Sequence, residues 1–344
     1  MTDPMTVTPL AAGSTPREVE GPSPTSVLTV RDLTISTTSP HPTQVVSGVS
    51  LTVRPGEAVA IVGESGSGKS VTALSCLGLL PEGLRVAEGS IDVLGTSVVG
   101  AREGALRRIR GRDIAMVFQD PMTSLDPCYT VGSQLVESVR AHRQVPKDEA
   151  RRLAVEMLDM VEIPRAKERV SDYPHEFSGG MRQRVMIAGA LILRPRILVA
   201  DEPTTALDVT TQASILRLVD NLRTELGMAV VWISHDLGVV AEVADRVAVM
   251  YAGEIVEAAA TPDLFAAPTH PYTRGLIDSA TTRPRGEPFG YIGGNVPAPG
   301  EWGTGCRFEA RCAQAAEMCS KHPPLYPLVS GHVHRCVVEA EAKR

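Results

Sequence analysis

The feature that most constrains this chain is a glycine-rich loop, GESGSGKS, at residues 63–70. It follows the apolar run AVAIV and precedes SVTALSCLGLL, a pattern that predicts a helix ending at Pro81. Backbone N–H groups of such a loop point at phosphate oxygens, and the helix N-terminus adds positive potential. We expect Lys69 to reach the β- and γ-phosphates of a nucleotide and the Ser70 hydroxyl to bind Mg²⁺. The predicted phosphate-binding residues are Gly63, Glu64, Ser65, Gly66, Ser67, Gly68, Lys69 and Ser70.

Two further apolar runs end on residues that suit nucleotide hydrolysis. ILVAD brings Asp201 to the end of an expected buried strand, where a carboxylate can hold Mg²⁺. Glu202 is then placed to orient or deprotonate the attacking water. MAVVWIS ends at His235, whose imidazole can contact the γ-phosphate, although a lone histidine at a strand end is more often structural. Together these patterns predict a P-loop NTPase with Glu202, His235 and Lys69 as catalytic residues.

The composition argues against several other classes of protein. The formal net charge is −6 and no strongly basic block is present, so we expect no nucleic-acid partner. Hydrophobic residues make up 43 % of the chain, which excludes a wholly disordered protein. No apolar run approaches the roughly 18–20 residues that span a bilayer, and no secretory signal is visible.

Local patterns outline the rest of the chain. Residues 1–25 are rich in Pro, Ser and Thr and predict a disordered tail. SVLTVRDLTIS and VVSGVSLTV predict strands, and residues 140–170 predict helices. VAVMYAGEIVEA predicts a hairpin that turns at Ala252-Gly253, whereas residues 281–305 are rich in Gly and Pro and predict a loop.

A second glycine pair, in FSGGMRQ at residues 177–183, opens another predicted helix. It has a conventional explanation, a helix start with Ser178 as its N-cap. It is also a second anion-binding helix N-terminus on a chain that already has one phosphate loop. A second anion-binding helix N-terminus has a function if it binds the nucleotide of a partner subunit.

The order of these motifs resembles that of ABC-type ATPase subunits. GESGSGKS, Gln119, FSGGMRQR, ILVADEP, Ala206-Leu207-Asp208 and His235 follow one another within residues 27–260. The resemblance implies an α/β fold with a P-loop NTPase core around a parallel sheet. It adds an N-terminal antiparallel β subdomain, an α-helical subdomain and a small Cys-rich C-terminal extension. The implied boundaries are 1–25 for the tail, 26–260 for the ATPase domain with its helical subdomain at about 120–185, and 261–344 for the extension.

The resemblance also implies how the site is completed. Two subunits would form a head-to-tail dimer with two ATP molecules, each held between the P-loop of one subunit and the Ser-Gly-Gly helix of the other. Ser178, Gly179 and Gly180 would act in trans, and Asp208 would lie at the dimer seam. Gln119 would touch Mg²⁺ or the attacking water and count among the catalytic residues.

One departure from this family concerns adenine. ABC subunits usually stack an aromatic side chain on the base, from the segment ahead of the P-loop. Here that segment, PHPTQVVSG, contains no Tyr, Phe or Trp. Either His41 substitutes or the base is held loosely.

Segments outside the ATPase motifs resemble the oligopeptide, dipeptide and nickel importers, and within them the D-type ATPase. They are FQDPMTSLDP, YPHEFSGGMRQRVMIAGALILRPRILVADEPTTALDVTTQ and THPYTRGL. The implied partners are two membrane permeases, an F-type sister ATPase and, indirectly, a solute-binding protein, at the cytoplasmic face of the membrane. Residues 119–130 would line the groove for a permease helix, unless they form an ordinary surface loop. Peptides lead as the cargo; nickel or another small solute, and a soluble ABC ATPase without transport, are the alternatives.

Four cysteines cluster near the C-terminus with the spacing Cys306-x5-Cys312-x6-Cys319-x16-Cys336. In a cytosolic protein such clustering favours metal over disulfides, although the C-x-x-C pairs of zinc ribbons are absent. The segment resembles the extension of peptide-importer ATPases, which implies a [4Fe–4S] cluster. Zn²⁺ and free thiols are the alternatives.

Overall fold

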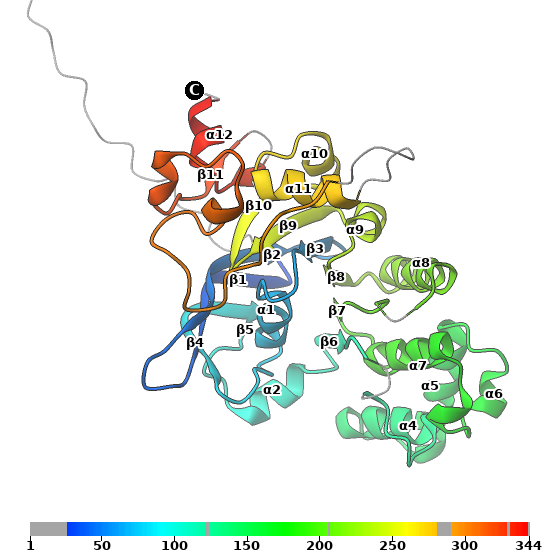
Figure 1. Cartoon of the computed structure of the whole chain (residues 1–344). Coiled ribbons are helices and arrows are strands. Elements are labelled where there is room, and N and C mark those ends of the chain that lie inside the picture. Colours follow the sequence, from blue (N-terminus) through cyan, green and yellow to red (C-terminus); the bar gives the residue numbers. More distant parts are fainter. Residues whose placement is uncertain (1–25, 121–123, 206, 281–289, 329–330, 343–344) are drawn as a thin grey trace, which may run out of the picture.

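The structure is a computed structural model that describes residues 26–120, 124–205, 207–280, 290–328 and 331–342. The predicted tail, residues 1–25, lies outside these ranges. Two sheets organise the described chain, one of eight strands in the order β11-β12-β10-β9-β3-β8-β7-β6 and one of four in the order β2-β1-β4-β5. Figure 1 shows helices on both sides of the larger sheet and a separate group of helices beyond β6.

Five adjacent parallel strands form most of the larger sheet and reach its edge at β6. They are β3 (Ala58–Val62), β6 (Ile114–Val117), β7 (Ile197–Asp201), β8 (Ala229–Ser234) and β9 (Arg246–Tyr251). Nearly every residue in them is buried, as expected of parallel strands that are covered on both faces. Their carboxyl ends meet at one edge of the sheet, which is where open α/β sheets place their ligands.

The other strands of this sheet come from later in the chain. β10 (Glu254–Ala260) pairs with β9 as an antiparallel hairpin that turns at Ala252-Gly253, which confirms the predicted turn. β12 (Val333–His334) pairs with β10, and β11 (Tyr326–Pro327) pairs with β12. The segment that carries the cysteines is therefore hydrogen-bonded into the same sheet as the phosphate loop.

The smaller sheet is antiparallel and packs over the first helix. It contains β1 (Leu28–Thr37), β2 (Gln44–Val53), β4 (Leu84–Val93) and β5 (Thr96–Ser97), and one buried cluster joins it to α1 (Lys69–Cys76) and the parallel strands. The predicted strands at β1 and β2 are confirmed. α1 ends at Cys76 rather than at Pro81, because Gly78 adopts a left-handed backbone conformation with φ 65°.

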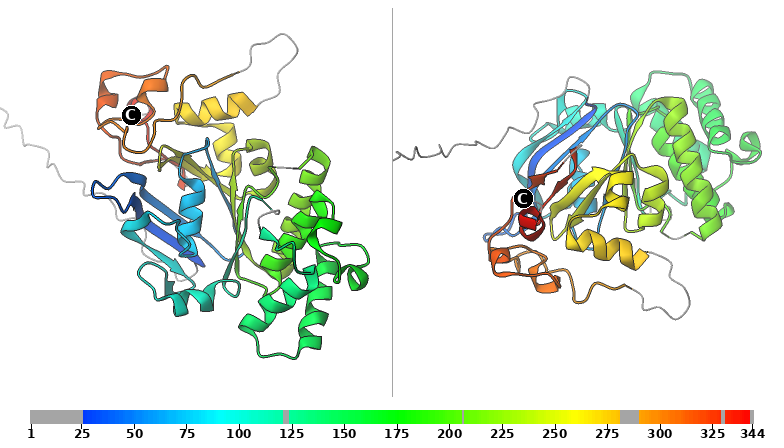
Figure 2. Two further views of the ribbon diagram at one scale, coloured as in Figure 1. Left: turned by 60° about the horizontal axis from the view of Figure 1, so that its bottom comes forward. Right: turned by 90° about the horizontal axis from the view of Figure 1, so that it is seen from above.

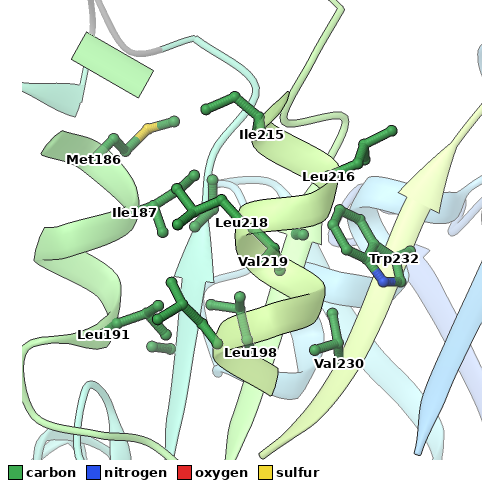
Figure 3. Close-up of a cluster of buried hydrophobic side chains, with 14 of the residues drawn as sticks. Met186, Ile187, Leu191, Leu198, Ile215, Leu216, Leu218, Val219, Val230 and Trp232 are labelled. Atoms are coloured by element: carbon green, nitrogen blue, oxygen red, sulfur yellow. The ribbon is translucent and has the colours of Figure 1, made fainter. Parts of the chain in front are cut away.

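A group of helices stands apart from the two sheets in both views of Figure 2. It contains α4 (Val131–His142), α5 (Lys147–Met160), α6 (Ala166–Arg169), the 3₁₀ turn η1 (Pro174–Glu176) and α7 (Gly179–Leu191). α7 leads back to the core, where it packs beside α8 (Val209–Leu226). Figure 3 shows Met186, Ile187 and Leu191 of α7 facing α8 and Leu198 of β7, while Trp232 of β8 lies on the other side of α8.

Shorter helices complete the described chain. α2 (Glu103–Ile109) follows the smaller sheet, α9 (Leu237–Val243) follows β8, and α10 (Thr261–Ala266) and α11 (Pro271–Ala280) follow the hairpin. The cysteine-bearing segment contains the turns η2 (Glu309–Arg311) and η3 (Glu317–Ser320) and ends in α12 (Val337–Ala342). Among the described helices, none has the length and apolar character needed to cross a membrane.

Candidate active site

The glycine-rich loop lies between β3 and α1, as the sequence predicts. Gly63 has φ 155°, and a Cβ there would come within 2.1 Å of the Met250 carbonyl oxygen, so only glycine fits. Lys69 is 5 % exposed, and its Nζ donates to the carbonyl oxygens of Gly63 at 2.7 Å and Glu64 at 2.9 Å. Burial lowers the pKa of Lys69, while the nearby carboxylates oppose that shift. The ammonium group of Lys69 is thus held against the phosphate-binding loop.

Ser70 and Asp201 meet across the site, although 130 residues separate them in the chain. Ser70 Oγ donates to Asp201 Oδ1 at 3.1 Å. Burial raises the pKa of Asp201, and the hydroxyl of Ser70 and the charge of Lys69 oppose the shift. A hydroxyl and a carboxylate oxygen at this separation are a suitable pair of ligands for Mg²⁺ beside a bound triphosphate. The geometry therefore agrees with the predicted magnesium residues.

Three side chains converge on a single oxygen of Glu202. Gln119 Nε2 donates to Glu202 Oε2 at 3.4 Å, and Thr205 Oγ1 donates to the same atom at 3.0 Å. His235 Nδ1 lies 3.1 Å from it. These groups arrive from the ends of β6, β7 and β8, which adjoin in the sheet. The carboxylate is consequently fixed in one orientation at the mouth of the phosphate loop.

One open cavity of about 1020 Å³ contains most of the predicted site. Its lining includes Glu64, Ser65, Gly66, Gly68, Lys69 and Ser70 of the loop, together with Gln119, Glu202 and His235. It also includes Val45 of β2 and four residues from the C-terminal part of the chain. His41 does not line it; it is exposed, and its carbonyl oxygen accepts from Ser39 Oγ.

The predicted trans-acting residues lie elsewhere in the same chain. Ser178 is the N-cap of α7, its Oγ accepting from the Met181 N–H, and Ser178 and Gly179 are both exposed. Asp208 is the N-cap of α8, where hydrogen bonds from Thr211 hold the pKa of its carboxyl low. None of these residues lines the cavity around Lys69. Ala206 of the predicted Ala-Leu-Asp motif is outside the described residues.

Sequence reasoning missed two side chains that hold the loop from behind. The Glu64 N–H donates to Tyr272 Oη of α11 at 2.9 Å. Arg311 Nη1 and Nη2 donate to the two carboxylate oxygens of Glu64 at 2.6 and 3.0 Å, and these hydrogen bonds raise the pKa of Arg311. No motif marks either residue, because both reach the loop from more than 200 positions away. Thr205, by contrast, lies only three residues after Glu202, so the neighbouring motif could have indicated it.

The four cysteines of the predicted metal site gather around one small cavity. Cys306, Cys312, Cys319 and Cys336 all line it, and its volume is about 10 Å³, roughly the space of one water molecule. Burial raises the pKa of the Cys306 thiol to about 11. Among the described residues, no group of three or more His, Cys, Asp or Glu is arranged to hold a metal ion. The predicted [4Fe–4S] cluster is therefore not supported, because the thiols converge without leaving room for it.

Comparison with known protein families gives two matches. Residues 46–205 match the family described as ABC transporter. Residues 256–319 match the family described as oligopeptide/dipeptide transporter, C-terminal region.

Individual relatives resemble the chain over most of its length. A peptide import ATP-binding protein of Brucella melitensis is 50 % identical over 306 residues, which cover 85 % of this chain and 90 % of the relative. The oligopeptide transport ATP-binding protein OppD of Escherichia coli is 45 % identical over 321 residues, covering 92 % and 94 %.

Solved structures share the fold. CbiO1 of Clostridium perfringens, part of an ABC transporter complex, superposes with a TM-score of 0.61 at 28 % identity, covering 71 % of this chain and 92 % of that one. The ATP-binding cassette MJ0796, solved as a dimer bound to ADP and Pi, gives 0.60 at 30 % identity, covering 68 % and 98 %.

Proposed function

Because this chain belongs to the ABC transporter ATPases, in the branch of the oligopeptide and dipeptide importers, we propose that it hydrolyses ATP to drive peptide import. The observation that carries the proposal is the convergence of Lys69, Ser70 and Glu202 on one cavity, with Asp201 hydrogen-bonded to Ser70 behind its lining. The names of the relatives from Brucella melitensis and Escherichia coli support peptides as the cargo.

The contacts in the site suggest a role for each group. The loop amides and Lys69 would hold the phosphates, and Ser70 and Asp201 would hold a Mg²⁺ ion, whose charge would neutralise that of the phosphate oxygens. Glu202 accepts a proton from the attacking water, because its carboxylate is fixed by Thr205, Gln119 and His235. His235 is 56 % exposed, so it remains free to meet the γ-phosphate when a nucleotide is bound.

We propose that the site is completed by a second ATPase subunit. The exposure of Ser178 and Gly179, and their absence from the cavity lining of their own chain, support a role in trans. The dimer of MJ0796 with ADP and Pi is a precedent for such an assembly in a relative. We propose an F-type sister as the second subunit, with Asp208 at the seam between the two. ATP binding then brings the two ATPase subunits together, provided that ATP binds the closed dimer more tightly than the open one.

A second cavity supports the contact with the membrane permeases. It has a volume of about 550 Å³ and lies between the sheet and the helical group, and its lining includes Leu77, Leu79, Met116, Phe118 and Leu125. Phe118 is 40 % exposed there and adds an aromatic ring to an otherwise largely aliphatic lining. We propose that a permease helix docks at this cavity on the cytoplasmic side of the membrane. Residues 121–123 of the predicted groove are outside the described residues.

The cysteine cavity calls for its own measurement. Thiolates are the chemistry of a soft metal site, but among the described residues the four thiols are not arranged around a metal ion, and the volume of about 10 Å³ argues against a cluster in this arrangement. Anaerobic purification followed by iron, sulfide and zinc analysis separates the alternatives. Equal iron and sulfide, four of each per chain, would establish the [4Fe–4S] cluster; one zinc would establish Zn²⁺; neither would leave free thiols. We also propose that the ATPase domain ends near residue 260 and that the extension occupies 261–344.

The function is tested by purifying the protein from gently solubilised membranes under anaerobic conditions and identifying what accompanies it. We expect two permeases, a second ATPase and a solute-binding protein, whose ligand then identifies the cargo. If the solute-binding protein that is recovered binds a metal ion, the cargo is nickel or a similar small solute and not a peptide. Ribosomes or nucleic-acid enzymes without membrane proteins would overturn the transport function and leave only the ATPase chemistry.

A further inference from the structure

The nucleotide cavity is not formed by the ATPase core alone. Besides the phosphate loop and the catalytic groups, its lining includes Gly294, Asn295, Val296 and Pro299. These residues belong to the connection between α11 and the cysteine-bearing segment. In Figure 1 this connection is the orange loop that runs past β9 and β2. A segment far from every nucleotide motif therefore forms part of the wall.

This wall is at the end of the cavity away from the catalytic groups. Gln119, Glu202 and His235 follow β6, β7 and β8, which lie on one side of β3. β2 and the connection lie on the other side, with β9 and β10. A Cβ at Gly300 would be 3.1 Å from Thr43 Cγ2, and one at Gly253 would meet both the Trp302 ring and the Val45 carbonyl oxygen. A nucleotide with its γ-phosphate at the catalytic end would have its base directed toward Val45 and this connection.

The chemistry of the wall suits a purine base. Val45, Val296 and Pro299 present apolar surface, as binding pockets do to the faces of flat ligands. Asn295 adds a carboxamide, which donates through its nitrogen and accepts through its oxygen. That pairing matches the adjacent donor and acceptor on an edge of adenine, and asparagine is one of the two side chains that bind adenine in this bidentate way. The wall thus supplies what the segment ahead of the phosphate loop lacks.

One buried guanidinium connects the wall to the phosphate loop. Arg311 Nε donates to the Gly293 carbonyl oxygen at 2.8 Å, and its Nη2 donates to that of Ile292 at 3.2 Å. The same side chain, 4 % exposed, pairs with both carboxylate oxygens of Glu64. The Trp302 ring is held in turn by the Arg307 guanidinium, 3.8 Å from its centroid. The connection is therefore set in place beside the loop before any nucleotide arrives.

From this arrangement we infer that the connection Gly294–Pro299 is the adenine-binding wall of the nucleotide site, with Asn295 reading the edge of the base and Arg311 as a positioning residue. The inference rests on the proposed function, since it requires that the cavity bind ATP. A contact from the C-terminal extension thus takes the place of the aromatic stacking residue that is absent from the segment ahead of the phosphate loop.

The test compares a ligand that has a base with one that has none. Binding of ATP, GTP and inorganic tripolyphosphate, each with Mg²⁺, is measured by calorimetry for the full-length wild type, Asn295→Ala and Val296→Ala. Tyr291→Ala is the matched control, because Tyr291 is in the same connection, is 86 % exposed and does not line the cavity. Thermal unfolding of each variant shows that the fold is retained.

We expect Asn295→Ala to weaken ATP binding about 5- to 10-fold, as loss of hydrogen bonds in a binding site does, and to bring ATP and GTP closer in affinity. Tripolyphosphate binding stays at the wild-type level, and Tyr291→Ala binds all three ligands as the wild type does. Unchanged ATP binding in Asn295→Ala and Val296→Ala, or an equal loss for ATP and tripolyphosphate, overturns the inference. A wild-type protein that binds no ATP would instead refute the proposed function.

Discussion

At the scale of single residues, the conformation of Glu202 is more informative than its identity. Its φ of 45° lies in the left-handed region, which costs a residue other than glycine on the order of 1 kcal/mol. The conformation is retained because the Glu202 N–H donates to the Ile233 carbonyl oxygen at 2.9 Å and three side chains meet its Oε2. Strain of this kind, held by surrounding contacts, is characteristic of a residue that must point in one direction.

Thr205→Val tests whether this orientation matters for catalysis. The substitution removes the hydrogen bond of 3.0 Å to Glu202 Oε2 and leaves the phosphate loop untouched. We expect kcat to fall about 3- to 10-fold with KM for ATP unchanged, as for loss of one hydrogen bond that serves the reacting state. Thr224→Val is the control, since Thr224 is exposed on α8 and bonds only a helix carbonyl among the described contacts. A wild-type kcat for Thr205→Val would show that Thr205 is dispensable.

Residues marked by a local motif could be predicted, and those that act from a distance could not. Asp201 and His235 stand at the ends of apolar runs, so their placement follows from strand direction, whereas Lys69 is located by the glycine-rich loop that precedes it. Tyr272 and Arg311 contact Glu64 only because the sheet brings the two parts of the chain together. Nothing in their own neighbourhood along the sequence specifies that contact.

At the scale of elements, α7 and α8 set the positions of the two helix ends expected at the subunit seam. Ser178 and Asp208 are their N-caps, and a Cβ at Gly180 would lie 2.7 Å from Thr211 Cγ2, so the two ends are close. The packing shown in Figure 3 holds the pair together further along. Stability of this interface is therefore linked to the geometry of the proposed trans site.

Ile187→Ala tests the packing between these helices. Ile187 is fully buried, and truncation of such a side chain typically costs about 2–5 kcal/mol because a cavity remains. Urea unfolding should show a loss in that range. The control is Val209→Ala, because Val209 is 84 % exposed and such substitutions usually change stability by less than about 0.5 kcal/mol. Equal effects of the two substitutions would mean that the α7–α8 contact contributes little.

His270, at the start of α11, predicts an acid-sensitive junction with the extension. Burial, together with the nearby His334, Arg335 and Arg274, lowers the pKa of His270 to about 3. Its Nδ1 accepts from the Tyr272 N–H at 3.1 Å. The unfolded chain, with a histidine pKa near 6.5, binds the proton first, so stability falls as the pH drops below about 6.5.

The expected loss is about 1 kcal/mol of unfolding free energy between pH 6.5 and pH 5.5 from this one group. His270→Gln is less stable at neutral pH but should show a correspondingly shallower decline over the same interval. Urea unfolding at the two pH values measures both. Identical pH slopes for wild type and variant would contradict a neutral buried His270.

Elements with strong periodicity were predictable, whereas short ones were not. β1, β2 and the β9–β10 hairpin follow from alternation and a Gly turn in the sequence. α1 ends early because Gly78 stops it. The glycine is visible in the sequence, but the apolar residues that follow it favour a longer helix. β11 and β12 have two residues each, too few to show any alternation, so the extension of the sheet was missed.

At the scale of the whole molecule, the nucleotide cavity lies between the ATPase core and the C-terminal extension. β12 pairs with β10, Arg311 pairs with Glu64, and the connection before it forms part of the cavity wall. A conformational change in the extension can therefore reach the phosphate loop through direct contacts. The second cavity lies where the helical group and the sheet meet, and Phe118 in its lining is the chain neighbour of Gln119 in the nucleotide cavity.

The central claim is that Glu202 activates water at this site in the assembled transporter. The most direct measurement is steady-state phosphate release by the purified complex with wild-type chain, Glu202→Gln or Lys69→Ala, beside ATP binding by each. We predict that Glu202→Gln lowers turnover at least about 100-fold, to the level of Lys69→Ala, while it binds ATP as the wild type does and Lys69→Ala does not. Turnover near the wild-type level in Glu202→Gln would contradict the account.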